Sequence, residues 1–175
     1  MKATSYQDFA DGFSVDQIIQ NFVGNFNDGI NGCVELCDRW ADDKARIALR
    51  YERIDGSRGE LSFAELQRRS AQFANYLTSL GIGRGDRVAG LLPRTPELLI
   101  CVMGALRAGA VYQPLFTAFG AGAIEYRLQK AGTKLVVTNT EQWPKLSEVA
   151  ELPNTLLLAE ADAAEAAQAG ALFYP

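Results

Sequence analysis

The sequence predicts an α/β fold with an open, mostly parallel sheet that has helices on both faces, preceded by a helix and a β-hairpin. Short strand-like segments begin at residues 87, 111, 134 and 155, so they recur every 21 to 24 residues. The stretches between them are long enough for helical crossovers, which parallel strands require. The strands are mostly apolar, which is typical of strands covered on both faces. We therefore divide the chain into residues 1–60, with the helix and hairpin, and residues 61–175, with the repeating βα unit.

The first predicted element is a helix within residues 15–40, with Ser14 as its cap. Apolar residues recur there largely in steps of three and four, as one buried face of a helix requires. These residues are Ile18, Ile19, Phe22, Phe26, Ile30, Val34 and Cys37. Interior glycines lower helix stability, so either one unbroken helix or a break between Asn27 and Gly32 fits the sequence.

A β-hairpin and a helix follow. Residues 47–54 alternate apolar and charged side chains, and the turn Asp55-Gly56-Ser57 leads into residues 59–63, which predicts two antiparallel strands. Ser62 then fits a helix cap, with Glu65 three residues later as the partner of a capping box. Gly81 is placed to end this helix.

The remaining strands are expected at residues 87–92, 111–115, 134–138 and 155–159, and the helices at residues 96–108, 121–131 and 144–152. Pro114 is expected to end its strand's ladder because proline lacks the amide hydrogen. Good helix formers fill an Ala-rich tail, which stops at an aromatic end beside Pro175. We interpret the chain as cut before its domain is complete; a genuine short protein is the alternative.

Composition and charge exclude several classes of function. The net charge is −4 with a sequence pI of about 4.9, so nucleic acid and anionic membranes are not expected partners. The start lacks a secretory signal, and the longest apolar run, residues 98–106, is about half a membrane span. We therefore expect a cytoplasmic protein without a membrane span.

The chain contains no histidine, which removes Ser-His-Asp and Cys-His catalytic arrangements. Cys33, Cys37 and Cys101 are expected to serve as small apolar packing residues, with too few soft ligands for a structural zinc site. We predict no catalytic residue and no metal site within the chain.

Two segments at the carboxyl ends of predicted strands are candidates for ligand contact, since open α/β sheets bind ligands there. Arg94 precedes a helix start at Thr95-Pro96 and could line a cleft for an anion or nucleotide; a well-made turn with a solvated arginine is the alternative. Phe116 and Phe119 could stack on a planar ligand or belong to the core.

Three strings, GDRVAGLLPRTPELL, ALRAGAVYQPLFTAFG and RLQKAGTKLVVT, resemble the early part of the adenylate-forming superfamily, in the branch of acetyl-CoA synthetases and medium-chain acyl-CoA ligases. The resemblance spans residues 59–140. It implies the first subdomain of the large N-terminal domain of an AMP-forming ligase. Such enzymes convert a short- or medium-chain carboxylic acid and MgATP into an acyl-adenylate and then, with CoA, into an acyl-CoA.

The resemblance also assigns candidate residues. Phe116, Thr117 and Ala118 match a turn that lies along CoA, although relatives carry glycines at the second and third of these positions. Relatives place arginines that meet the CoA phosphate just after the strand expected at residues 134–138. This sequence offers Trp143-Pro144-Lys145 instead, which makes Lys145 a candidate. The phosphate loop, the adenine and Mg²⁺ motifs and the catalytic lysine would follow Pro175. We therefore expect the chain alone to be inactive and to bind neither MgATP nor CoA tightly.

Two further expectations concern partners. A stand-alone interaction or regulatory protein that kept the fold after losing catalysis is the alternative to a ligase fragment. Uncovered strand edges and the apolar residues 172–174 also predict that the isolated chain self-associates.

Overall fold

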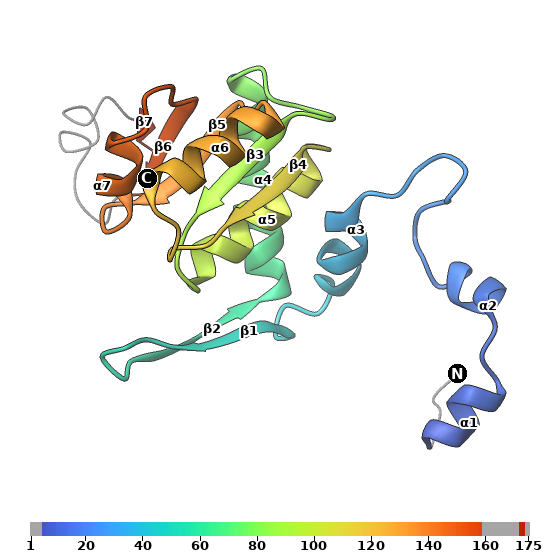
Figure 1. The fold of residues 1–175 in the computed structure, drawn as a ribbon. Helices are drawn as coiled ribbons and strands as arrows, with labels where there is room; N and C mark the ends of the chain where they lie inside the picture. The colour runs from blue at the N-terminus through green and yellow to red at the C-terminus, as the bar shows by residue number, and fades with distance from the viewer. Residues whose placement is uncertain (1–4, 159–171, 174–175) are drawn as a thin grey trace.

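The structure is a computed structural model, and it describes residues 5–158 and 172–173. Its centre is a five-stranded sheet in the order β4-β3-β5-β6-β7, with every pair of neighbours parallel (Figure 1). The strands are β3 (Arg87–Leu91), β4 (Val111–Leu115), β5 (Leu135–Asn139), β6 (Asn154–Leu158) and β7 (Leu172–Phe173). The predicted fold class, an open parallel sheet with helical connections, is confirmed.

Helices cover both faces of the sheet. Successive residues of a strand point to opposite sides, so each strand contributes apolar side chains to both faces. On one face, Val88 and Val137 pack with Phe73 of α4 (Phe63–Ser79) and with α5 (Pro96–Arg107). On the other face, Ala89 and Val136 pack with α6 (Ala121–Ala131) and α7 (Trp143–Ser147). Fully burying a large apolar side chain is worth about 1.5–3 kcal/mol, so these two layers hold the strands between the helices.

The strand β4 continues through Pro114, so the expectation that this proline ends the ladder is wrong. Pro114 lies opposite Gly90 of β3, and the pairing extends to Leu115 opposite Leu91. Among the described strands β4 has β3 as its one neighbour. At an edge, a proline whose nitrogen faces away from the neighbouring strand costs no ladder hydrogen bond.

The single helix considered for residues 15–40 is not formed, and the break is wider than the predicted one. The segment contains α2 (Val15–Ile19), α3 (Gly32–Leu36) and the 3₁₀ helix η1 (Asp38–Trp40), and α1 (Tyr6–Asp11) precedes them. Gly29 has φ of +93°, a conformation outside the helical region. We call residues 5–30 the arm: it projects from the rest of the molecule (Figure 1), and none of its residues is buried. The part of the predicted buried face that lies within the arm is therefore not buried, whereas Cys37 at its end is.

The hairpin and the helix that follows it agree with prediction in outline. The hairpin pairs β1 (Ile47–Glu52) with β2 (Arg58–Ser62). Ser62 Oγ accepts from the Glu65 amide at 3.2 Å, and Gly81 adopts φ of +72° after the last turn of α4. The reciprocal half of the capping box is absent, because the Glu65 carboxylate accepts from Arg68 and Arg69 instead.

The end of the chain differs most from expectation. The helix α7 stops at Ser147 rather than continuing to residue 152, and Val149 is buried beyond it in the second core. A helix that continued to residue 152 would also be unfavourable at its end, because the residue before a proline, here Pro153, is disfavoured in the helical conformation. Leu172–Phe173 forms β7 beside β6, a strand that was not predicted. The predicted Ala-rich helical tail lies outside the described residues. In the described part of the chain, no helix has the length and apolar character that crossing a membrane requires.

Candidate functional site

The carboxyl ends of β3, β4 and β5 lie level with one another. Leu91 pairs with Leu115 of β4 on one side and with Thr138 of β5 on the other. The segments that follow these strands therefore leave the same edge of the sheet. The edge brings together candidate residues that are nearly 30 positions apart in the sequence.

Lys145 of α7 reaches back to the turn after β4. Its Nζ donates to the backbone oxygen of Thr117 and, at 2.8 Å, to Oε1 of Gln142. An ammonium group carries three protons, so two are used and one remains. The structure thus joins Lys145 to the Phe116–Ala118 turn, a contact that spacing alone could not reveal.

The two aromatic residues of this turn have different environments. Phe116 is 70% exposed, whereas Phe119 is half-buried against the second core. Their rings meet edge to face with centroids 5.4 Å apart, and the guanidinium of Arg127 lies 4.2 Å from the Phe119 ring centroid. Phe119 therefore supports Phe116, whose exposed ring remains available for stacking.

The backbone of the turn does not require glycine. No non-glycine residue described in the structure has a positive φ, so Thr117 and Ala118 adopt conformations that any residue can adopt. Thr117 is half-buried and Ala118 is exposed. The glycines expected in relatives are thus not needed for the backbone conformation of this turn.

Arg94 lies apart from these contacts. It is exposed in the loop after β3, and it makes no hydrogen bond or ion pair with another described residue. Thr95 is the N-cap residue of α5 and Pro96 the first helical residue, but the Thr95 side chain makes no capping bond. The sequence predicted this helix start correctly, and the structure does not bring Arg94 into contact with Lys145 or the Phe116 turn.

Buried polar side chains behind the edge were not predicted as site residues. Thr138 is fully buried and its Oγ1 donates to the Leu91 backbone oxygen at 3.1 Å. Gln142 is 5% exposed; its backbone N–H donates to Asn139 Oδ1 at 3.1 Å, and its side-chain oxygen accepts from Lys145. A polar run directly after the apolar residues of β5 was the available sequence signal. These bonds hold Lys145 in place relative to the strand ends.

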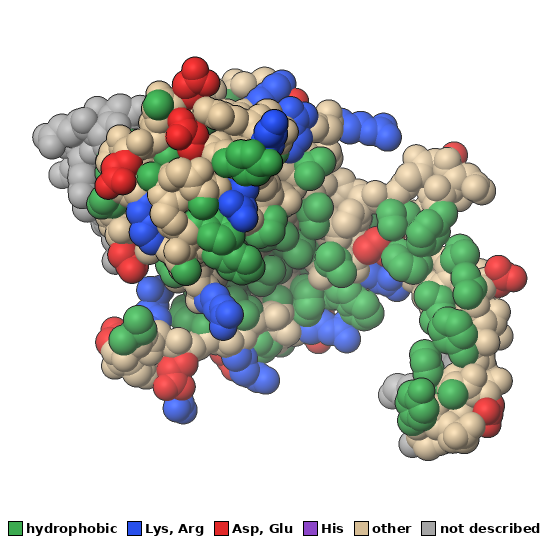
Figure 2. Space-filling view, viewed as in Figure 1, with side chains coloured by type: hydrophobic (Ala, Val, Ile, Leu, Met, Phe, Trp, Pro, Cys, Tyr) green, Lys and Arg blue, Asp and Glu red, His purple; other side chains and the backbone are tan. Residues whose placement is uncertain are grey.

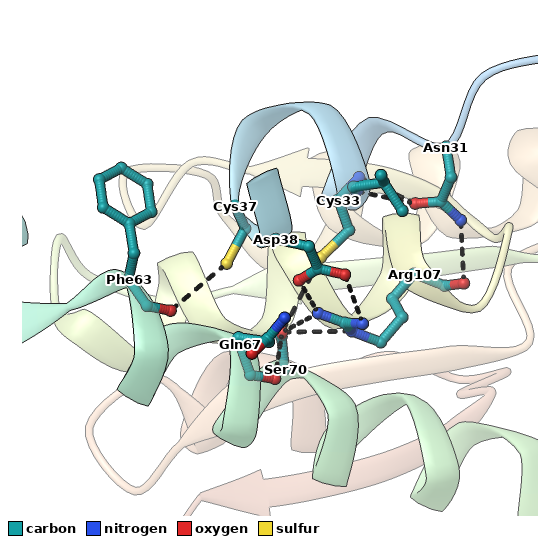
Figure 3. A network of polar contacts seen from close by, with 9 residues as sticks. Asn31, Cys33, Cys37, Asp38, Phe63, Gln67, Ser70 and Arg107 are labelled. Carbon is teal, nitrogen blue, oxygen red and sulfur yellow. Dashed lines mark hydrogen bonds and ion pairs between the residues drawn. The ribbon is translucent and has the colours of Figure 1, made fainter. Parts of the chain in front are cut away.

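A second polar cluster lies where α3 and η1 meet α4 and α5 (Figure 3). Arg107 donates to both carboxylate oxygens of Asp38, at 2.5 and 2.9 Å, and to Ser70 Oγ at 3.2 Å. The side chain of Asn31 donates to the Arg107 backbone oxygen at 3.1 Å and also caps α3. Four segments of the chain are connected by this network.

Cys33 and Cys37 belong to the same cluster and are free and fully buried, as predicted. The neighbouring Cys37 side chain lowers the pKa of the Cys33 thiol to about 7, while burial acts in the opposite direction. Their sulfur atoms and an Asp38 oxygen lie within 4.8 Å of one another, close enough for metal ligands. However, both carboxylate oxygens of Asp38 already accept hydrogen bonds from Arg107, and the Cys37 thiol donates to the Phe63 backbone oxygen at 3.8 Å. The cluster therefore serves to connect helices.

Sequence comparison identifies relatives of this chain. The family profile described as "AMP-binding enzyme" matches residues 37–172. The acetyl-coenzyme A synthetase of Chromobacterium violaceum is 39% identical over 118 residues, which is 66% of this chain and 18% of the relative. The 3-hydroxypropionyl-coenzyme A synthetase of Metallosphaera sedula is 32% identical over 143 residues, covering 81% of this chain and 21% of that protein.

Structural comparison agrees. A crystal structure of Brucella canis acyl-CoA synthetase matches with a TM-score of 0.82 and 47% identity, over 88% of this chain and 28% of the other. The chain thus spans about one fifth of the length of the sequence relatives above. The level strand ends, the crossover helices and the profile match over most of the chain lead to one assignment. The chain belongs to the family of AMP-binding enzymes.

Proposed function

We propose that this chain is the N-terminal part of an ATP-dependent acid–CoA ligase. The ligase would form an acyl-adenylate from a short- or medium-chain carboxylic acid and then transfer the acyl group to CoA. The observation that carries the proposal is the family match over residues 37–172 together with the 47% identical acyl-CoA synthetase structure.

Within that enzyme, the edge formed by Phe116, Thr117, Ala118 and Lys145 would contact CoA. The exposed Phe116 ring offers a face for the adenine of CoA, because aromatic rings stack on nucleobases. The unused proton of Lys145 can donate to a phosphate oxygen, and the positive charge favours that anion. Arg94, exposed at the end of β3, would line the neighbouring part of the cleft toward an anionic group.

Magnesium and the phosphates of ATP are not assigned to the described residues. Mg²⁺ prefers oxygen ligands, and the described residues gather three metal-binding side chains only at Cys33, Cys37 and Asp38. Two thiols do not fit Mg²⁺. The reaction centre would therefore lie in a part of the longer enzyme that has no counterpart here, and this chain alone would be inactive.

The test compares this 175-residue chain with the longer protein encoded by its gene. We expect pyrophosphate release from ATP with the longer protein and a panel of short and medium acids, and none with the chain alone. Pyrophosphate release by the chain alone would refute the proposal that the reaction centre lies in another part of the longer enzyme. A stop codon directly after Pro175 would instead favour the alternative of a stand-alone interaction or regulatory protein.

Lys145 gives a sharper test of the CoA edge. In the longer protein, Lys145→Ala should raise the KM for CoA about tenfold, the effect of losing about 1.4 kcal/mol, and leave acid-dependent pyrophosphate release without CoA unchanged. Lys44→Ala, at an exposed lysine of the loop before β1, is the control. An equal effect of Lys145→Ala on both half-reactions would indicate a structural role.

We also propose that the isolated chain self-associates. Among the described strands, β4 and β7 lie at the edges of the sheet, and edge strands that are neither paired nor covered favour contacts between copies. The expectation that residues 172–174 contribute rests on side chains outside the described residues.

A further inference from the structure

Lys145 is held by neutral oxygens. Its Nζ donates to the backbone oxygen of Thr117 and, at 2.8 Å, to Oε1 of Gln142. It forms no ion pair with a carboxylate of the described residues. A carboxylate partner would offset much of the positive charge, whereas a neutral oxygen leaves that charge uncompensated. The lysine is therefore held in place without losing the charge that attracts an anion.

Cations elsewhere on the chain commonly have acidic neighbours. Figure 2 shows Lys and Arg side chains interspersed with acidic ones over the face in view. Lys134, for example, pairs with Asp86 at 2.7 Å. The exposed Glu148 lies three residues after Lys145, a spacing at which helical neighbours can pair. The ammonium of Lys145 instead contacts the amide oxygen of Gln142, so its neutral surroundings are not due to a lack of carboxylates nearby in the sequence.

Gln142 is itself held independently of the lysine. Its backbone N–H donates to Asn139 Oδ1 at 3.1 Å, and it is the N-cap residue of α7. Its side chain makes no capping bond to that helix, and its oxygen accepts from Lys145 instead. Leu146 is fully buried and Trp143 packs against the same second core. The position of the acceptor oxygen is thus fixed by the backbone and by the core.

A fixed acceptor matters because lysine is flexible. Its ammonium is a strongly hydrated point charge on a four-carbon stem, so a lysine without partners occupies many positions. Two acceptors on different elements, the turn after β4 and the start of α7, restrict the Lys145 side chain before a ligand arrives. Less conformational entropy is then lost when an anion binds to the remaining proton.

We propose that Gln142 is a positioning residue that makes the CoA edge selective for a phosphate-bearing thiol. It holds Lys145 beside the Phe116–Ala118 turn and leaves the charge of the ammonium for a phosphate of CoA. Gln142 acts through Lys145 and does not itself contact the ligand. The inference rests on the CoA edge proposed above; it adds the residue on which selectivity depends and a reason why that side chain is an amide and not a carboxylate.

The experiment compares kcat/KM for CoA with kcat/KM for pantetheine in the longer protein encoded by the gene. Pantetheine carries the same thiol as CoA but no phosphate. A general defect in folding or in acyl transfer lowers both values, whereas a loss of phosphate recognition lowers the value for CoA alone. The ratio of the two values therefore reports the proposed role.

Three substitutions of glutamine test this ratio. Gln142→Met keeps the length of the side chain but removes the acceptor, and it should lower the CoA-to-pantetheine ratio by about three- to tenfold, the effect of one hydrogen bond. Gln142→Glu keeps an acceptor but offsets the charge of Lys145, and it should lower the ratio by about tenfold. Gln129→Met, at an exposed glutamine of α6, is the matched control and should keep the wild-type ratio.

A double variant separates positioning from a structural role. If Gln142 acts through Lys145, then Gln142→Met should not lower the ratio further in a Lys145→Ala background. A full additional loss there would overturn the positioning role, and so would a wild-type ratio in Gln142→Met beside a lowered ratio in Lys145→Ala. A wild-type ratio in Lys145→Ala would overturn the CoA edge and this inference with it. A longer protein without any CoA-dependent turnover would refute the ligase proposal as well.

Discussion

Arg107 shows how much of this fold depends on single polar side chains. It lies at the end of α5, with its side chain 22% exposed, and pairs with Asp38, whose side chain is 18% exposed. A guanidinium that meets both oxygens of a carboxylate forms a strong and directional contact. The same residue contacts Ser70 on α4 and Asn31 before α3 (Figure 3). Arg107 therefore helps to hold α3 and η1 against α4 and α5.

Substituting Arg107 should destabilise the chain strongly. Arg107→Ala leaves Asp38 partly buried without its partner, and we expect the free energy of unfolding to fall by about 2–3 kcal/mol. Urea unfolding followed by circular dichroism measures it. Arg69→Ala removes a more exposed pair with Glu65 and should cost less than about 1 kcal/mol. Equal losses in the two variants would contradict this ranking.

Glu65 predicts a pH dependence of stability. Hydrogen bonds from Arg68 and then Arg69 lower the pKa of its carboxyl from 4.5 to about 2. Because the folded pKa is the lower one, the stabilisation is complete above pH 4.5 and is lost as the pH falls toward 2. The stability difference between wild type and Glu65→Gln should therefore narrow as the pH decreases from about 5.5 to about 3. A constant difference in urea unfolding across that range would show that the ionised carboxylate is not what stabilises α4.

At the scale of elements, α4 and α5 approach each other closely at Gly104. Gly104 of α5 has no room for a side chain: an added Cβ would lie 2.5 Å from the Phe73 ring and 3.0 Å from the Ser70 backbone oxygen. The glycine thus permits an approach of the two helices that places Phe73 in the core. This explains why a residue that disfavours helices stands inside one.

Two glycine substitutions should have opposite effects. Gly104→Ala introduces the clash with Phe73 and should lower stability by about 1–3 kcal/mol, despite the better helix propensity of alanine. Gly122→Ala lies in α6, where no atom comes within 4 Å of the added Cβ, and should raise stability by about 0.5–1 kcal/mol. Thermal or urea unfolding distinguishes them, and a gain in both variants would show that α4 and α5 separate readily.

The elements that local pattern predicted are those with strong apolar periodicity. The bounds predicted for β4 and α6 match, because each apolar segment is enclosed by turn residues. The prediction of one helix for residues 15–40 failed, since the periodic apolar side chains from Ile18 to Ile30 are not buried and only the last of the set, Cys37, reaches the core. Pro114 and β7 were misread because whether a strand lies at an edge depends on the order of the whole sheet, which local sequence does not specify.

The candidate site could likewise be predicted only in part. Position after a strand identified Arg94 and the Phe116 turn, and the family resemblance added Lys145. The bond between Lys145 and Thr117 depends on how α7 lies relative to the turn after β4, which is a property of tertiary structure. Thr138 and Gln142 were missed because a buried polar residue looks like a loop residue until its partners are known.

At the scale of the whole molecule, the arm and the body are energetically distinct. Residues 5–22 bury no side chain, so they contribute little to the hydrophobic stabilisation of the sheet. The contacts between the arm and the body begin at Val23 and Gly24. Hydrogen bonds from the Gly24 amide, the Val23 amide and Arg39 lower the pKa of the Glu35 carboxyl, whereas burial raises it.

Truncation tests this independence. Removing residues 1–21 should leave the free energy of unfolding of the body within about 0.5 kcal/mol of wild type, the range for changes that touch no buried contact. The measurement belongs at low concentration, where copies do not associate. A loss of several kcal/mol would mean that the arm is part of the cooperative unit.

Pro114 has a consequence for how copies of this chain can meet. Fibrils grow when a free strand edge offers an unbroken row of amide donors and carbonyl acceptors to the next molecule. The outer edge of β4 lacks one donor at Pro114, so an incoming strand would leave a carbonyl unpaired in the middle of the new ladder. Contacts at this side of the sheet are thereby directed to side chains, and reversible assembly is favoured over amyloid growth.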